Sequence, residues 1–122
     1  MSESAHRWIP AAGEPVRLIA ELANAHEGRV DCAERMIDAA AESGADTVKF
    51  QKYLPEEMLA AGHAQMDLFR RLCWPDAAWG KLVRRAKDKG LFVFIDVFGV
   101  EAFDFASRLD GVDGFKVHAA DL

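Results

Sequence analysis

The chain has 122 residues, which corresponds to one domain on the usual scale of about 100–200 residues per domain. Hydrophobic residues make up 51% and charged residues 29%, a balance that excludes a disordered chain and predicts a packed core. The net charge of -5 disfavours a phosphate backbone or an anionic membrane surface as partner, so we expect neither nucleic acid nor membrane.

No stretch of the sequence has the length of a membrane helix. The longest wholly apolar run covers residues 91–95, against the roughly 18–20 residues that span a bilayer. The first residues lack the basic start and apolar core of a secretory signal, so we expect a cytoplasmic location. Cys32 and Cys73 are too few for a disulfide scaffold and are expected to be structural thiols.

The chain begins with a lead-in segment over residues 1–15, in which two prolines and a glycine interrupt both regular periods. The run over 16–20, apolar except for Arg17, ends at Glu21 and predicts a short buried strand. The spacing then changes to the 3.6-residue period of a helix over about 30–41, with Asp31 placed as its N-terminal cap.

One pattern then occurs three times, a helix closed by glycine and followed by an apolar strand with a single charge near its end. The three glycines are Gly44, Gly90 and Gly111. The first and third copies match closely, GADTVK over 44–49 against GVDGFK over 111–116. The further predicted helices lie over residues 67–72, 75–89 and 100–109. The second is expected to have Trp79, Leu82, Val83 and Ala86 on one face, and the third to have Phe103, Ala106 and Leu109 inward.

The resulting order, βαβαβαβ with near-continuous apolar strands, is typical of a parallel sheet covered by helices. Four strands fit in the chain, whereas a complete eight-stranded β/α barrel takes about 250 residues. The sequence therefore predicts an α/β fold, the first half of a TIM-type (β/α)8 barrel, as one domain over residues 16–122 after the lead-in over 1–15.

Each predicted strand ends with a charged residue, and in such folds the site lies at the carboxyl ends of the strands. These residues are Glu21, Lys49, Asp96 and Lys116. A buried lysine is unstable unless it meets an anion, so two lysines at equivalent strand positions favour a phosphate or carboxylate ligand. A structural ion pair with a neighbouring strand-end carboxylate is the open alternative.

Three histidines lie near the predicted site: His26 in the loop after the first strand, His63 in the loop after the second, and His118 beyond the fourth. A lone loop histidine is expected to face solvent. No two histidines have a metal-site spacing, and there is neither a Gly-rich phosphate loop nor a nucleophile elbow. Trp74 and Trp79 are expected in the core.

Several blocks of the sequence together resemble the sialic acid synthase family. The blocks are LIAELANAHEG over 18–28, IDAA over 37–40, GADTVKFQ over 44–51, FKV over 115–117 and DL over 121–122. The resemblance covers about residues 16–122, with all blocks in order. It implies the N-terminal part of the barrel of an enzyme of N-acetylneuraminate biosynthesis, which condenses phosphoenolpyruvate with N-acetylmannosamine or a related amino sugar.

The resemblance also implies roles for individual residues. Glu21 matches a catalytic carboxylate, and Lys49 and Lys116 match the lysines that hold the anionic groups of phosphoenolpyruvate. The other expected substrate contacts are Gln51, His63, Asp121 and His26. In the family a divalent metal, Mn or Mg, polarises the sugar aldehyde for attack by the enol carbon. Its histidine ligands come from the second half of the barrel, so we expect no metal ligand in this chain.

Several positions depart from the family pattern, among them His63, where relatives can have a sugar-binding asparagine. Ala25 stands where the family has asparagine, with Asn24 next to it. Ala119 and Ala120 replace the common Ser-Gly after the fourth strand. Asp96 begins Asp-Val-Phe where Thr-Pro-Phe is usual, and places a negative charge near the expected anion site. These departures leave the identity of the sugar open.

Three functions therefore stay open. The first is the N-terminal half of a sialic acid synthase-like transferase, inactive as the isolated chain. The second is a non-catalytic half-barrel that binds a small anion or serves as an assembly partner. The third is an aldolase-type barrel with a Schiff-base lysine at Lys49 or Lys116. Because an open parallel sheet has unpaired edges, we expect a homo-oligomer or completion by a second half-barrel.

Overall fold

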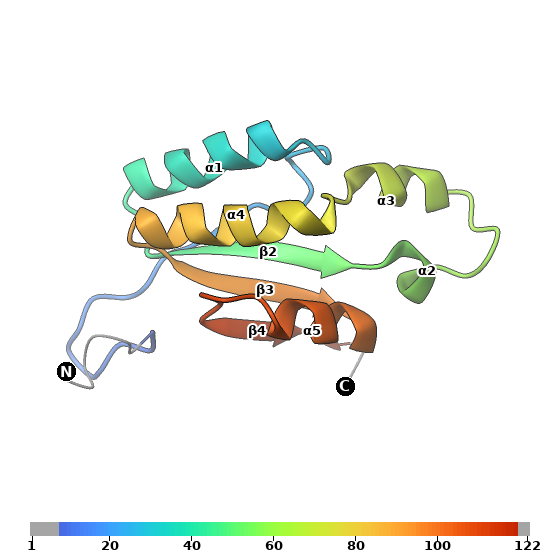
Figure 1. Cartoon of the computed structure of the whole chain (residues 1–122). Coiled ribbons are helices and arrows are strands. Elements are labelled where there is room, and N and C mark those ends of the chain that lie inside the picture. Colours follow the sequence, from blue (N-terminus) through green and yellow to red (C-terminus); the bar gives the residue numbers. More distant parts are fainter. Residues whose placement is uncertain (1–7, 120–122) are drawn as a thin grey trace.

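A parallel sheet of four strands, in the order β1-β2-β3-β4, forms the centre of the structure (Figure 1). The computed structural model describes residues 8–119. The strands are β1 Ile19–Glu21, β2 Thr47–Tyr53, β3 Phe92–Phe98 and β4 Gly114–Val117. Each strand pairs in parallel with the next along the chain, which confirms the predicted half of a β/α barrel.

The helices connect the strands and cover one face of the sheet. They are α1 Val30–Glu42, α2 Pro55–Met58, α3 Met66–Leu72, α4 Asp76–Asp88 and α5 Val100–Ser107. In Figure 1, α1 and α4 run alongside the strands, and α2 and α3 lie beyond the carboxyl end of β2. No helix within residues 8–119 is long and apolar enough to cross a membrane. The short α2 and the extension of β2 to Tyr53 were not predicted, because polar residues interrupt the apolar run after Val48.

One apolar core lies between the sheet and the helices. Alternate residues of β2 and β3 project into it, because successive side chains of a strand point to opposite faces. Those strand residues are Val48, Phe50, Val93, Ile95 and Val97. The predicted inner face of α4 is confirmed, with Trp79, Leu82, Val83 and Ala86 all buried. Trp74 is buried beside Trp79, as expected.

Helices α1 and α4 are joined by a bidentate ion pair. Arg85 on α4 donates to both carboxylate oxygens of Asp38 on α1, at 2.9 and 2.6 Å. This guanidinium holds the pKa of the Asp38 carboxyl below its ordinary value. The planar fork of arginine fixes the relative position of the two helices as well as attracting the charge.

The aspartate of the first and third copies of the repeated pattern, Asp46 and Asp113, has the same structural role in both. Asp46, before β2, donates its amide to the carbonyl of Leu18 and accepts a hydrogen bond from the Leu18 amide at 2.8 Å. Asp113, before β4, makes the same two bonds with Val93, the side-chain bond again at 2.8 Å. Each aspartate thus holds the amino end of the neighbouring strand, at Leu18 just before β1 and at Val93 in β3, and helps to fix the pairing register.

Three local predictions are wrong. The first strand is not buried, because β1 lies at the edge of the sheet and Leu18 and Ile19 are exposed. Asp31 does not cap α1, because the helix begins at Val30 with Arg29 in the cap position. Asp31 lies in the first turn and pairs with Arg29 and Arg35, where its charge still favours the helix N-terminus. Phe103 of α5 does not point inward but is exposed, and its ring packs edge-on against Phe115 at 5.1 Å between centroids.

The lead-in segment contacts the face of the sheet opposite the helices. The indole nitrogen of Trp8 donates to the Thr47 hydroxyl at 2.8 Å, and the Trp8 ring lies 4.4 Å from the Phe94 ring. Thr47 is at the amino end of β2 and is fully buried. Trp8 therefore covers the amino end of this face, and the charged strand ends Glu21 and Lys116 stay accessible.

Candidate functional site

Four charged side chains, one from each strand, lie together on the face opposite the helices. The sheet register pairs Glu21 with Lys49 and Asp96 with Lys116. Because paired residues of neighbouring strands project to the same face, each lysine lies beside a carboxylate of the adjacent strand. We call these four residues the charge cluster.

The distances in the charge cluster define a continuous chain of ion pairs. Lys49 Nζ lies 2.6 Å from Glu21 Oε2, and Lys116 Nζ lies 2.9 Å from Asp96 Oδ2. Lys49 Nζ also lies 3.9 Å from the same Oδ2 atom of Asp96. The structure therefore shows the ion pairs that the sequence left open as the alternative to a bound anion, and the four formal charges sum to zero.

Burial differs strongly within the charge cluster. The exposed fraction of the side chain is 4% for Asp96 and 15% for Lys49, but 38% for Glu21 and 51% for Lys116. Asp96 Oδ1 is buried and has no hydrogen-bond partner among the described residues. A carboxylate this deeply buried is stable only beside its two lysines, since an uncompensated buried charge is strongly unfavourable.

Gln51 and Tyr53 continue the same face of β2 toward its carboxyl end. Gln51 is the register partner of Asp96 and is half-buried. The Tyr53 hydroxyl donates to Asn24 Oδ1 at 3.1 Å, which links β2 to the loop after β1. Burial raises the pKa of Tyr53 above its ordinary value, so this hydroxyl keeps its proton. Sequence reasoning missed Tyr53, although the alternation of polar residues along β2 was the signal for it.

His26 is buried, with only 3% of its surface exposed, so the expectation that a lone loop histidine faces solvent is wrong here. Its Nδ1 accepts a hydrogen bond from the Gly28 amide at 2.9 Å, and its ring lies 4.2 Å from the Trp74 ring. Ala23 and Glu27 adopt positive φ angles of 46° and 55°, which turn the loop back onto the protein. Loop geometry of this kind is invisible to a periodicity argument.

Gly28 ends this loop with a φ of 76°. A Cβ atom here would collide with the backbone carbonyl of Arg71 at the end of α3. Glycine is therefore required both by the backbone conformation and by the close approach of the loop to α3.

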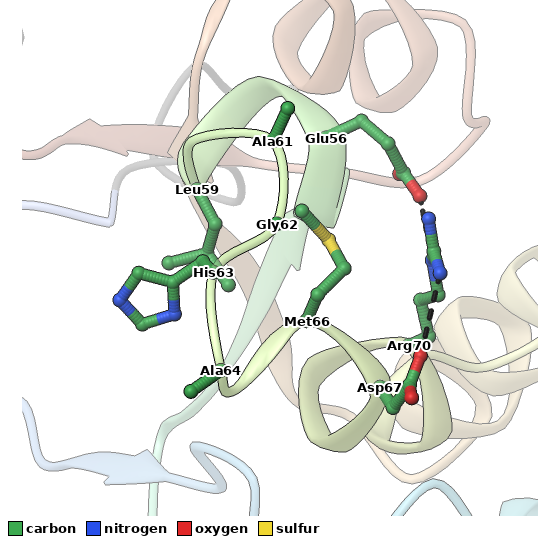
Figure 2. Close-up of a pocket in the computed structure, with 9 residues that line it drawn as sticks. All are labelled: Glu56, Leu59, Ala61, Gly62, His63, Ala64, Met66, Asp67 and Arg70. Atoms are coloured by element: carbon green, nitrogen blue, oxygen red, sulfur yellow. Dashed lines mark hydrogen bonds and ion pairs between the residues drawn. The ribbon is translucent and has the colours of Figure 1, made fainter.

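His63 lies in a different part of the molecule, at the rim of a cavity of about 420 Å³ beside α2 and α3. Figure 2 shows its ring turned away from Arg70, which pairs with Glu56 at 2.7 Å and with Asp67 at 3.4 Å. His63 Nδ1 accepts a hydrogen bond from the Gln65 amide at 3.1 Å, within its own loop. None of the charge cluster lines this cavity, whose full lining is Glu56, Leu59, Ala61, Gly62, His63, Ala64, Met66, Asp67 and Arg70.

Two other expected positions lie at the end of the chain. His118 follows β4, and its ring lies 5.4 Å from the Phe98 ring. Asp121, expected to contact substrate, lies outside the described residues. Over residues 8–119 no group of three or more His, Cys, Asp or Glu side chains is arranged to hold a metal ion. Because Glu21 and Asp96 already contact lysines, the described site does not fit a divalent metal.

Comparison with known proteins identifies the family. The family model for NeuB matches residues 36–122, most of the chain. The chain belongs to the NeuB family. This agrees with the expected sialic acid synthase family, since relatives of this NeuB chain carry synthase names of that kind.

Human N-acetylneuraminate-9-phosphate synthase is 30% identical over 128 residues, covering 94% of the NeuB chain and 35% of the relative. Pseudaminic acid synthase of Campylobacter jejuni is 25% identical over 111 residues, covering 80% and 32%. The crystal structure of N-acetylneuraminic acid synthetase from Leptospira borgpetersenii in complex with citrate superposes with a TM-score of 0.81 at 28% identity, covering 93% of this chain and 41% of that one. The chain thus spans about a third of the length of these curated relatives.

The burial of His26 predicts how stability depends on pH. Burial lowers the pKa of His26 below its ordinary value of 6.5, although a hydrogen bond with the Ala23 backbone opposes this shift. Unfolding frees the ring to take up a proton, so the free energy of unfolding should decrease as the pH falls below about 6.5. Urea denaturation between pH 5 and 8, at about half-unit steps, measures this slope.

The test variant for this prediction is His26→Asn, and its control is His63→Asn. The first keeps an acceptor for the Gly28 amide but cannot titrate, so it should flatten the slope between about pH 5 and 7. The second removes an exposed histidine and should leave the slope unchanged. Equal slopes in the parent chain and His26→Asn would show that the burial of His26 has no such effect.

Proposed function

We propose that this NeuB chain is the N-terminal half of a sialic acid synthase-like transferase and that its charge cluster binds the anionic groups of phosphoenolpyruvate. The carrying observation is that Lys49 Nζ and Lys116 Nζ, from different strands, converge on one oxygen atom of Asp96, at 3.9 and 2.9 Å. A ligand oxygen placed there would meet two ammonium groups. The names of the relatives support this substrate class.

The proposed roles follow from position. Glu21, 2.6 Å from Lys49 Nζ, orients that ammonium group and stays accessible to a ligand. Gln51 presents an amide on the same face, suited to a sugar hydroxyl or N-acetyl group. Asp121 and His63 are proposed as sugar contacts from the resemblance. The buried His26 would act by holding the loop after β1 against Trp74.

In the proposed reaction, the C=C π electrons of phosphoenolpyruvate form a bond from the enol carbon to the aldehyde carbon of the open-chain amino sugar, and the C=O π electrons move to the aldehyde oxygen, which takes up a proton. Water then adds at the neighbouring, electron-deficient carbon of the former enol and loses a proton. The C–O bond to phosphate breaks, phosphate leaves with the electron pair, and a keto group forms at that carbon. The charge cluster accounts for holding the phosphoenolpyruvate anion. Both lysines of the cluster are paired with carboxylates, and the resemblance implies that the metal ligands of the family come from the second half of the barrel, so we propose that the isolated chain binds without turnover. We propose a cytoplasmic location, where phosphoenolpyruvate is produced.

The second candidate function is a non-catalytic half-barrel that binds a small anion or serves as an assembly partner. The zero net charge of the cluster favours the assembly role, because each lysine is already neutralised by a carboxylate. The aldolase-type alternative requires a lysine that reacts with a ketone. Borohydride trapping of a ketoacid on Lys49 or Lys116 separates that chemistry from both other functions.

Phosphoenolpyruvate should raise the melting temperature of the chain, because a ligand that binds only the folded state stabilises it by RT ln(1 + [L]/Kd). The double variant Lys49→Ala/Lys116→Ala should lose this shift. The control Lys81→Ala/Lys89→Ala removes the same charge from exposed positions on and just after α4 and should keep it. If the first double variant responds to ligand like the parent chain, the proposed anion site is wrong.

Turnover should require more than this chain. The 122-residue protein, supplied with phosphoenolpyruvate, N-acetylmannosamine and Mn²⁺, should release no phosphate above background, because unassisted attack on the aldehyde leaves the developing alkoxide without electrostatic stabilisation. A malachite-green phosphate assay measures release with and without the sugar. Sugar-dependent release by the purified chain would contradict the proposal.

Assembly should be visible in solution. Among the described residues β1 and β4 each pair on one side only, and both edges carry exposed apolar side chains. These are Leu18, Ile19, Phe115 and Val117. We propose that they mediate a homo-oligomer or contact with a second half-barrel, so sedimentation velocity should detect a dimer or larger species.

The variant Phe115→Lys should shift the distribution of oligomeric states toward monomer. The control Leu68→Lys, which changes an exposed apolar residue on α3, should not. A stable folded monomer of the parent chain at all concentrations would contradict self-association.

A further inference from the structure

We propose that Asp96 is an internal counter-ion that competes with anionic ligands for Lys49 and Lys116 and thereby sets which anions the site accepts. This inference rests on the proposed function of the charge cluster. Its basis is the position of one atom, Asp96 Oδ2, which lies 2.9 Å from Lys116 Nζ and 3.9 Å from Lys49 Nζ. That atom occupies the point where a ligand oxygen would be held.

Asp96 cannot leave this position easily. It lies in the middle of β3, which pairs with β2 through Gln51 and with β4 through Lys116, so its backbone is held on both sides. Its side chain is 4% exposed and therefore has no solvated orientation within reach. An incoming anion must draw the lysines away from Asp96 while the carboxylate stays beside it.

The two lysines differ in their freedom to do this. Lys116 has a half-exposed side chain on an edge strand and can turn toward a ligand. Lys49 is 15% exposed and remains attached to Glu21. A ligand anion therefore gains mainly the contact with Lys116, and it does so next to the negative charge of Asp96. The repulsion grows with the charge of the ligand, so a phosphate dianion is disfavoured more than a carboxylate monoanion.

A neutral residue at position 96 changes this balance. Glu21 would then be the one remaining carboxylate of the charge cluster, and the cluster would carry one net positive charge. Asparagine keeps the shape of the side chain and an acceptor for Lys116 while removing the charge. The site should then bind anions more tightly, with the larger gain for the more highly charged ligand.

The experiment is isothermal titration of the 122-residue chain with inorganic phosphate, with phosphoenolpyruvate and with acetate at matched ionic strength and pH 7.5. Compared with the parent chain, Asp96→Asn should bind phosphate and phosphoenolpyruvate about tenfold more tightly or better, and acetate with a smaller gain. Asp88→Asn, at the exposed end of α4, makes the same charge change outside the cluster and should alter none of the three affinities.

Comparing the parent chain, Asp96→Asn and the double variant Asp96→Asn/Lys116→Ala shows which residue is the source of the gained affinity. Adding Lys116→Ala to Asp96→Asn should remove the gain, because the freed ammonium group is its source. An unchanged or weaker phosphate affinity in Asp96→Asn would overturn the proposal, as would an equal gain for acetate. If Asp96→Asn does not fold, Asp96→Thr replaces it. The parent chain offers a further test, since a tenfold or greater preference for phosphate over acetate would also overturn the proposal.

The outcomes separate this inference from the proposed function. Binding of phosphoenolpyruvate by the parent chain with no gain in Asp96→Asn leaves the proposed function standing and refutes the role of Asp96. Binding only in Asp96→Asn, lost with Lys116→Ala, supports the role of Asp96 and refutes anion binding by the natural chain. Absence of binding in both proteins refutes both.

Discussion

A charged side chain inside a parallel sheet is stable only beside an opposite charge, and every strand of this sheet contributes one charged side chain to the charge cluster. The register places Glu21 next to Lys49 and Asp96 next to Lys116, and the short distance from Lys49 to Asp96 joins the two pairs. The remaining features of the site depend on this arrangement. A shift of one residue in any strand would move its charged side chain to the apolar face, where no partner exists among the described core residues.

Several features of the fold protect this register. Asp46 and Asp113 each hold the amino end of a neighbouring strand through two hydrogen bonds. On the face covered by the helices, the apolar residues of β2 and β3 pack against α1, α4 and α5. Trp8 covers Thr47 and Phe94 at the amino end of the opposite face and leaves Glu21 and Lys116 of the charge cluster accessible to solvent. The sheet therefore has an apolar face that stabilises it and a polar face that can bind a ligand.

The same arrangement explains why family membership and site chemistry have to be considered separately. The NeuB match and the superposition with the Leptospira borgpetersenii synthetase establish the ancestry and the fold of the chain. They do not determine the affinity of the charge cluster, because a single buried carboxylate, Asp96, lies between the two lysines. Electrostatic interactions at such short range respond to each individual charge, so one substitution on a retained scaffold is enough to change the preferred ligand.

Sequence alone determined the strand order, the parallel sheet, the buried face of α4 and the repeated aspartate motif, because each follows from periodicity or from a short local pattern. It also identified Glu21, Lys49, Asp96 and Lys116 as strand-end charges. The tertiary structure decided that these charges pair with one another, that His26 is buried against Trp74, and that Tyr53 bonds Asn24. Those contacts join residues of different strands and loops, and their geometry depends on register and loop conformation, which no local pattern specifies.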